Sequence, residues 1–295
     1  MFTEPIFTGA ATALITPTTP EGVDYEALGR LIDWQIDAGI DALVIAGSTG
    51  EGKTLTIPEH KEVLRFSAER IAGRVPMIAG TGSNETSVSI SMSQYACEVG
   101  ADALLVVTPY YIKATQNGLV AMYTMIADAV SKPLILYNVP SRTGVNIEPE
   151  TYARLADHPN IAAIKEANSD ISKIATTAQL TAGRLVLYSG NDDQTLPILS
   201  LGGKGVISVL SNLLPAETSK MCHLYLDGDT AAATALQLKY LPLIHALFSE
   251  VNPIPAKAAM SAMGWCQNFL RMPLTPMEDA HKEKLFALMK AEGLI

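Results

Sequence analysis

The feature that most constrains the fold is a regular alternation of short apolar runs with stretches of helical periodicity. Each run has the length of a buried strand, and the segments between runs place apolar residues three and four positions apart. Eight such runs occur, at residues 9–17, 41–47, 76–80, 101–108, 133–137, 161–167, 185–189 and 205–209. This alternation predicts a parallel sheet, and eight strand–helix units fit a closed (β/α)₈ barrel.

Two observations concern the type of sheet and the residue at which the barrel ends. An open doubly wound sheet is the alternative, but no glycine-rich dinucleotide fingerprint follows the first run. After Gly228 only helical periodicity remains, interrupted by proline at residues 252–255 and 273–276. We therefore expect a TIM barrel over residues 1–228 and a C-terminal three-helix appendage over residues 229–295.

Composition excludes several classes of protein. The net charge of −9 does not fit a nucleic-acid binder, whose footprint is basic. The three cysteines are too far apart for a metal site and too few for a disulfide framework. No basic segment with an apolar core begins the chain, and no apolar run is long enough to cross a bilayer. We expect a cytoplasmic protein without a membrane partner.

Residues with useful chemistry gather where the predicted strands end. Active sites of such barrels lie at the carboxyl ends of the strands. The strand ends carry Ser48 and Thr49, Tyr111, Tyr137 and Arg142, Lys165, Gly190, and Ile207. Hydroxyls and glycine N–H groups can hold a carboxylate, phenols can shuttle protons, and a guanidinium can grip a second carboxylate.

Lys165 is the residue around which these groups make chemical sense. It lies near the carboxyl end of the apolar run Ile-Ala-Ala-Ile-Lys-Glu-Ala, where desolvation should lower its pKa. A neutral amine beside a ketone or aldehyde forms a Schiff base. A structural lysine that extends its amine to water is the alternative, and the neighbouring strand ends favour the catalytic interpretation.

A nucleotide-binding loop is a rival interpretation. Residues 47–54 match G-x-x-x-x-G-K-[ST] and follow an apolar run. Such a loop should lead directly into a helix, whereas Leu55, Thr56 and Ile57 come before the expected helix start at Pro58. The histidines show no paired ligand spacing, so we expect no metal site.

Five motifs in order resemble the dihydrodipicolinate synthase / N-acetylneuraminate lyase superfamily. They are Gly-Ser-Thr-Gly-Glu (47–51), Thr-Pro-Tyr-Tyr (108–111), Tyr-Asn-Val-Pro-Ser-Arg-Thr-Gly (137–144), Ile-Lys-Glu-Ala (164–167) and Gly-Gly-Lys-Gly-Val-Ile-Ser-Val (202–209). The resemblance covers essentially the whole chain. It implies a TIM barrel, class I aldolase chemistry on pyruvate, and no metal or organic cofactor.

The resemblance also implies roles for single residues. Lys165 would carry the pyruvate imine, Tyr137 would move protons, and Thr49 with the Ile207 backbone would hold pyruvate. Arg142 would bind the carboxylate of aspartate semialdehyde, which favours a role in lysine biosynthesis. The alternative is the same pyruvate chemistry with another substrate: N-acetylneuraminate, a 2-keto-3-deoxy sugar acid or 4-hydroxy-2-oxoglutarate. The family further implies a homotetramer, a dimer of dimers in which Tyr111 crosses between subunits to complete a relay with Tyr137 and Ser48.

The chain departs from the family pattern in two respects. Ser48 stands where the synthases usually have threonine; it keeps the hydroxyl but lacks the methyl group that restrains its rotamer. At the positions of the family's lysine-feedback site, Lys53 introduces a like charge and Val88 replaces the usual acidic residue. We therefore expect weak or absent inhibition by L-lysine.

Overall fold

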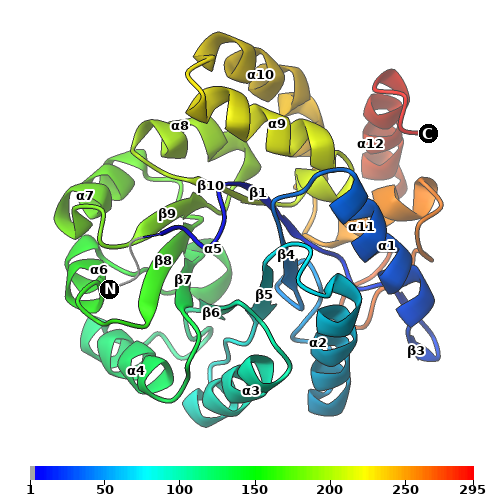
Figure 1. Ribbon diagram of the computed structural model, residues 1–295. Helices are drawn as coiled ribbons and strands as arrows, with labels where there is room; N and C mark the ends of the chain where they lie inside the picture. The colour runs from blue at the N-terminus through cyan, green and yellow to red at the C-terminus, as the bar shows by residue number, and fades with distance from the viewer. Residues whose placement is uncertain (1–3) are drawn as a thin grey trace.

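A closed barrel of eight parallel strands forms the centre of the molecule, as the computed structural model of residues 4–295 shows (Figure 1). The strands are β1 (Gly9–Ala13), β4 (Ala42–Ile45), β5 (Met77–Gly80), β6 (Ala103–Val107), β7 (Leu134–Asn138), β8 (Ile161–Glu166), β9 (Val186–Ser189) and β10 (Gly205–Ser208). Strand β1 pairs with both β4 and β10, which closes the ring. The predicted (β/α)₈ barrel is confirmed.

Helices surround the barrel on its outside (Figure 1). They are α1 (Tyr25–Asp37), α2 (Ile57–Ile71), α3 (Thr86–Glu98), α4 (Gln116–Asp128), α6 (Pro149–Leu155), α7 (Ile171–Thr181), α8 (Thr195–Ser200) and α9 (Pro215–Leu226). Three short helices lie between these: α5 (Pro140–Thr143), η1 (Asp192–Gln194) and η2 (Leu210–Asn212). Helix α2 begins with a capping box, in which Thr56 and Glu59 satisfy each other's backbone N–H groups.

Side chains fill the inside of the barrel, because strand residues alternate between its two faces. On β8, Ala163 belongs to the interior cluster, whereas Ile164 packs in the outer cluster beneath the helices. Phe7 and Tyr188 stack in the interior with ring centroids 4.2 Å apart, and the Tyr188 hydroxyl donates to the Phe7 carbonyl at 2.7 Å. The alternation turns Lys165 inward, like Ala163 two residues earlier.

The first strand is shorter than the sequence predicts. Strand β1 ends at Ala13, and the apolar residues Leu14 and Ile15 are buried by other contacts. The Asn212 side chain accepts from the Ile15 N–H at 3.0 Å and donates to the Ala13 carbonyl at 2.9 Å. A small antiparallel pair that was not expected, β2 (Thr18–Thr19) with β3 (Gly22–Val23), follows.

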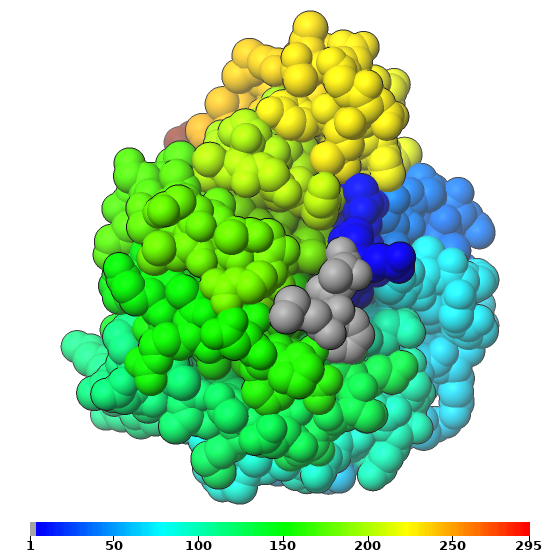
Figure 2. Space-filling model, turned by 60° about the vertical axis from the view of Figure 1, so that its left-hand side comes forward, coloured from blue at the N-terminus to red at the C-terminus, as the bar shows by residue number. Residues whose placement is uncertain are grey.

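Three helices follow the barrel, as predicted: α10 (Thr230–Leu247), α11 (Ile254–Ala262) and α12 (Asp279–Ala291). Helix α10 lies against α9, and together they form the yellow end of the molecule in Figure 2. Trp265, after α11, stacks on Trp34 of α1 with ring centroids 4.6 Å apart. The division of the chain at residue 228 stays a prediction. Within residues 4–295, no helix has the length and apolarity to cross a membrane.

Candidate active site

Two adjoining cavities lie over the carboxyl ends of the strands. They have volumes of about 320 and 270 Å³. Both are lined by Tyr137, Val139, Arg142, Val251 and Asn252, so they form one continuous site. The site lies where a TIM barrel places its chemistry, and it is lined by the C-terminal region as well as by the barrel.

Lys165 is buried in the smaller cavity. Strands β7 and β8 pair Tyr137 with Lys165, and the Lys165 Nζ lies 4.3 Å from the centroid of the Tyr137 ring. Burial lowers the pKa of Lys165, and the neighbouring Tyr137 and Asp192 act in the opposite direction. A lower pKa increases the fraction of neutral amine, which is the nucleophilic form.

The residue after Lys165 faces the other way and has several partners. Glu166 accepts hydrogen bonds from Asn138 Nδ2 at 2.9 Å, the Tyr152 hydroxyl at 2.9 Å and the Asn168 N–H at 2.8 Å. Burial raises the pKa of Glu166 to about 7, although these hydrogen bonds lower it. This network holds the end of β8 from outside, while Lys165 lies on the inner face.

Ser48 and Thr49 lie on a tight turn after β4. Ala46 and Glu51 on either side adopt left-handed backbone conformations, with φ of 55° and 52°. The Gly52 N–H donates to the Gly47 carbonyl at 3.1 Å. A Cβ atom at Gly52 would lie 2.1 Å from the Ala46 oxygen. Glycine is therefore required here, and the turn directs Ser48 to the larger cavity and Thr49 to the smaller one.

This turn does not have the geometry of a phosphate-binding loop. Helix α2 begins at Ile57, after a stretch of turns, so no helix N-terminus follows the motif directly. The Lys53 amine donates to the Gly82 carbonyl, and burial lowers its pKa to about 8. The glycines of the motif serve the turn after β4.

Arg142 lies on the short helix α5 and lines both cavities. Its Nη2 donates to the Asn252 carbonyl at 2.8 Å. The helix ends at Gly144, whose left-handed conformation, with φ of 73°, suits a residue without a side chain. This arrangement holds a guanidinium beside the cavity that contains Lys165.

The structure brings six of the eight predicted residues together. Ser48, Thr49, Tyr137, Arg142, Lys165 and Gly190 line one or both cavities. The side chain of Ile207 lies fully buried in β10, and that residue lines neither cavity. Tyr111 is 88% exposed, has a φ of 75° and also lines neither cavity. Tyr111 therefore lies outside the site that its own chain forms.

Two neighbours of the candidate site residues were not predicted. Asp192 is buried after β9 and accepts from the backbone N–H groups of Val209 and Leu210 at 2.9 and 3.1 Å. Burial raises the pKa of this carboxyl. Asn252 reaches in from the C-terminal region and donates from Nδ2 to Thr49 Oγ1 at 2.9 Å. The only signal at Asn252 was the proline-rich break that follows it.

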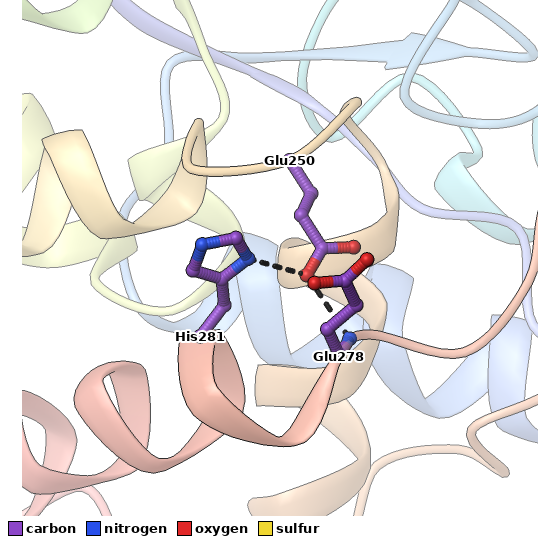
Figure 3. A group of neighbouring side chains, drawn as sticks. All are labelled: Glu250, Glu278 and His281. Atoms are coloured by element: carbon purple, nitrogen blue, oxygen red, sulfur yellow. Dashed lines mark hydrogen bonds and ion pairs between the residues drawn. The ribbon is translucent and has the colours of Figure 1, made fainter.

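Glu250, on the rim of the smaller cavity, is tied to the start of α12 (Figure 3). Its Oε1 lies 2.9 Å from His281 Nδ1 and accepts from the Glu278 N–H at 3.0 Å. One ligand atom from each of these three residues lies within 4.8 Å of the others. The hydrogen bonds account for the cluster, which links the last helix to the rim of the site.

Comparison with known proteins agrees with the barrel. The model of the dihydrodipicolinate synthetase family matches residues 6–292. A 4-hydroxy-tetrahydrodipicolinate synthase from Clostridium perfringens is 52% identical over 290 residues, which are 98% of this chain and 100% of that protein.

Two solved structures share the fold over nearly their whole length. A dihydrodipicolinate synthase from Acinetobacter baumannii in complex with pyruvate is 40% identical, with a TM-score of 0.95 and coverage of 98% of this chain and 99% of that one. A second, from Cyanidioschyzon merolae with lysine bound, is 40% identical, with a TM-score of 0.95 and coverage of 99% and 100%. With the family model, the full-length relatives and the fold in agreement, the chain belongs to the dihydrodipicolinate synthetase family.

Proposed function

We propose that this protein is a 4-hydroxy-tetrahydrodipicolinate synthase, which condenses pyruvate with L-aspartate 4-semialdehyde in lysine biosynthesis. The curated relatives carry this name at about half identity over the full chain. One observation carries the proposal: Lys165, a buried amine whose pKa is lowered, and the guanidinium of Arg142 line the same cavity. These are the groups needed to activate a ketone and to hold a substrate carboxylate.

The reaction begins with an imine. The neutral Lys165 amine attacks C2 of pyruvate, and the carbonyl oxygen leaves as water. Thr49 and the backbone of Ile207 hold the pyruvate carboxylate, and the glycine at position 190 allows close approach on the same side. At Gly190 a Cβ atom would lie 2.9 Å from the Ala167 side chain and 3.0 Å from the Glu166 oxygen, so this wall has no room for a larger residue.

Carbon–carbon bond formation follows. Tyr137 takes a proton from C3 of the imine, and the resulting enamine attacks the aldehyde carbon of the second substrate. Arg142 binds the carboxylate of that substrate. A relay of Tyr137, Ser48 and Tyr111 returns the proton to the new alkoxide. The amino group of the second substrate then attacks C2, closes the ring and releases Lys165 as a free amine.

The relay requires a second subunit. Tyr111 is exposed and lines neither of the cavities of its own chain, so its role depends on entering the site of a neighbouring chain. The proposed assembly is a homotetramer made of two such dimers. The cytoplasm is the proposed location, and it suits a chain whose three cysteines, Cys97, Cys222 and Cys266, are all free.

The test is a comparison of substrates. Purified protein should consume aspartate semialdehyde only when pyruvate is present, with the cyclic product identified by mass spectrometry. It should not cleave N-acetylneuraminate, a 2-keto-3-deoxy sugar acid or 4-hydroxy-2-oxoglutarate at a comparable rate. Faster cleavage of any of these three would assign the same imine chemistry to another aldehyde. Pyruvate binding without turnover of any substrate would indicate a sensor.

A further inference from the structure

A buried ion pair joins the C-terminal region to the turn that carries Ser48 and Thr49. Lys257 of α11 and Glu51 of the turn contact each other through Nζ and Oε1, and their side chains are 0% and 1% exposed. Lys257 also donates to Thr18 Oγ1 at 2.7 Å, and the Arg271 N–H donates to the second Glu51 oxygen at 3.3 Å. The carboxylate is therefore held by two groups distant in sequence, the amine of Lys257 and the N–H of Arg271.

The backbone of this turn needs such support. Ala46 and Glu51, at its two ends, both have positive φ although neither is glycine. A left-handed conformation is unfavourable for residues with a side chain and persists only where the surroundings enforce it. Glu51 adopts this unfavourable backbone conformation, and its carboxylate contacts Lys257. The same turn places Ser48 and Thr49 at the cavities.

A second contact from the same junction reaches the turn. Asn252, just before α11, donates from Nδ2 to Thr49 Oγ1 at 2.9 Å. Since the oxygen of Thr49 accepts this bond, its own proton is available for an anionic ligand in the smaller cavity. Asn252 therefore contacts Thr49, and Lys257 contacts Glu51 two residues further along the same turn.

Stability alone is a weak explanation for the pair. Burying two charges costs desolvation energy, and apolar replacements of similar shape are often neutral or stabilising. Removing only one partner is strongly destabilising, because it leaves an unpaired buried charge. An ion pair next to a substrate-binding hydroxyl can also fix the position of that hydroxyl.

We propose that the Glu51–Lys257 ion pair is a positioning element of the active site, through which the C-terminal region sets the place of Thr49 and thereby the affinity for pyruvate. This inference rests on the proposed function, in which Thr49 holds the pyruvate carboxylate. It makes Lys257 and Glu51 positioning residues that act through Thr49.

The experiment compares Lys257→Met with the charge-free double variant Glu51→Gln/Lys257→Met. The control is Lys239→Met, which removes the exposed lysine paired with Glu292 on the same C-terminal region. For each protein the melting temperature is measured, together with the pyruvate concentration that gives half-maximal imine trapping by borohydride. Trapping depends on pyruvate alone and is independent of the aldehyde.

We expect Lys257→Met to lower the melting temperature and the double variant to recover most of that loss. The half-maximal pyruvate concentration should stay raised by roughly tenfold in the double variant, because misplaced binding groups lose effectiveness steeply with distance. The control should match the wild type in both measurements.

A double variant with wild-type pyruvate dependence and normal stability would overturn the proposal and leave a purely structural ion pair. Failure of the proposed function looks different. In that case the wild type itself would trap no pyruvate, or would trap pyruvate normally and fail to condense it with aspartate semialdehyde.

Discussion

The two ends of the barrel pair their polar groups in different ways. At the amino end, Asp41 precedes β4 and has three partners: the Ala10 N–H at 2.8 Å, the Ser219 hydroxyl at 2.8 Å and His223 Nε2 at 2.7 Å. At the carboxyl end, Asp192 Oδ1 and Asn252 Oδ1 are buried without a hydrogen-bond partner within residues 4–295. An unpaired buried polar atom is costly, and each such atom in a native structure calls for an explanation.

The backbone shows the same contrast. Six described residues other than glycine have positive φ: Ala46, Glu51, Ala72, Tyr111, Lys113 and Ala182. Ala72 and Ala182 end helices α2 and α7, where this conformation is common. The other four lie in the loops after β4 and β6, at the carboxyl end. Backbone strain outside the helix caps is therefore found at the carboxyl end of the barrel, where the candidate active site lies.

The largest effect among the binding residues is expected at Arg142. Arg142→Ala should raise KM for aspartate semialdehyde by about a hundredfold, because a charged hydrogen-bonding pair with the substrate carboxylate is lost. KM for pyruvate should change little, and so should the melting temperature. Steady-state kinetics with each substrate varied in turn measure this, with Arg154→Ala on α6 as the control. An equal rise in both KM values would contradict the assignment of Arg142 to one substrate.

A smaller effect is expected for the proton relay. Ser48→Ala should lower kcat by roughly tenfold to a hundredfold, because it removes the hydroxyl between two phenols. Trapping of the pyruvate imine should remain. The measurement is kcat beside borohydride trapping, with Ser200→Ala at the end of α8 as the control. Full activity in Ser48→Ala would show that the relay does not pass through this residue.

A substitution at the amino end of the barrel should lower the stability of the protein and leave catalysis unchanged. Asp41→Asn converts one acceptor oxygen of a partly buried network into a donor, which should cost about 1 kcal/mol in the free energy of unfolding. Both kcat and KM should match the wild type. Chemical denaturation and kinetics test this, with the exposed Asp279→Asn as the control. A loss of activity in folded Asp41→Asn would end the proposed contrast between the two ends.

The smallest effect is expected from L-lysine. The amine of Lys53, bonded to the Gly82 carbonyl, adds positive charge near the candidate effector positions, and Val88 offers no carboxylate. We expect less than about a twofold change in rate at millimolar L-lysine, since like charges repel and the ammonium lacks a partner. Inhibition curves at saturating pyruvate test this. Strong inhibition below one millimolar would show that the relative with bound lysine is the better guide.

The sequence predicted the parts of the molecule that local patterns encode. Short apolar runs predicted the strands, and the position of Lys165 at the end of one run predicted an interior amine. Contacts between distant segments were not predictable. Asn252 and Thr49 are 203 residues apart, and Lys257 and Glu51 are 206 apart, so no local pattern indicates that they meet. The C-terminal side of the site was missed for this reason.

The exact length of the first strand was missed for a related reason. Leu14 and Ile15 are as apolar as strand residues, but other parts of the chain bury them after β1 ends. Apolarity reports burial, and burial alone does not distinguish a paired strand from a covered loop.

The central claim is that Lys165 forms an imine with pyruvate. The direct measurement is intact mass after incubation with pyruvate and borohydride, on the wild type and on Lys165→Ala. We predict a pyruvyl-sized adduct on the wild type and none on Lys165→Ala, with both proteins folded by circular dichroism. An equal adduct on both would place the imine on another lysine, and no adduct on either would contradict the mechanism.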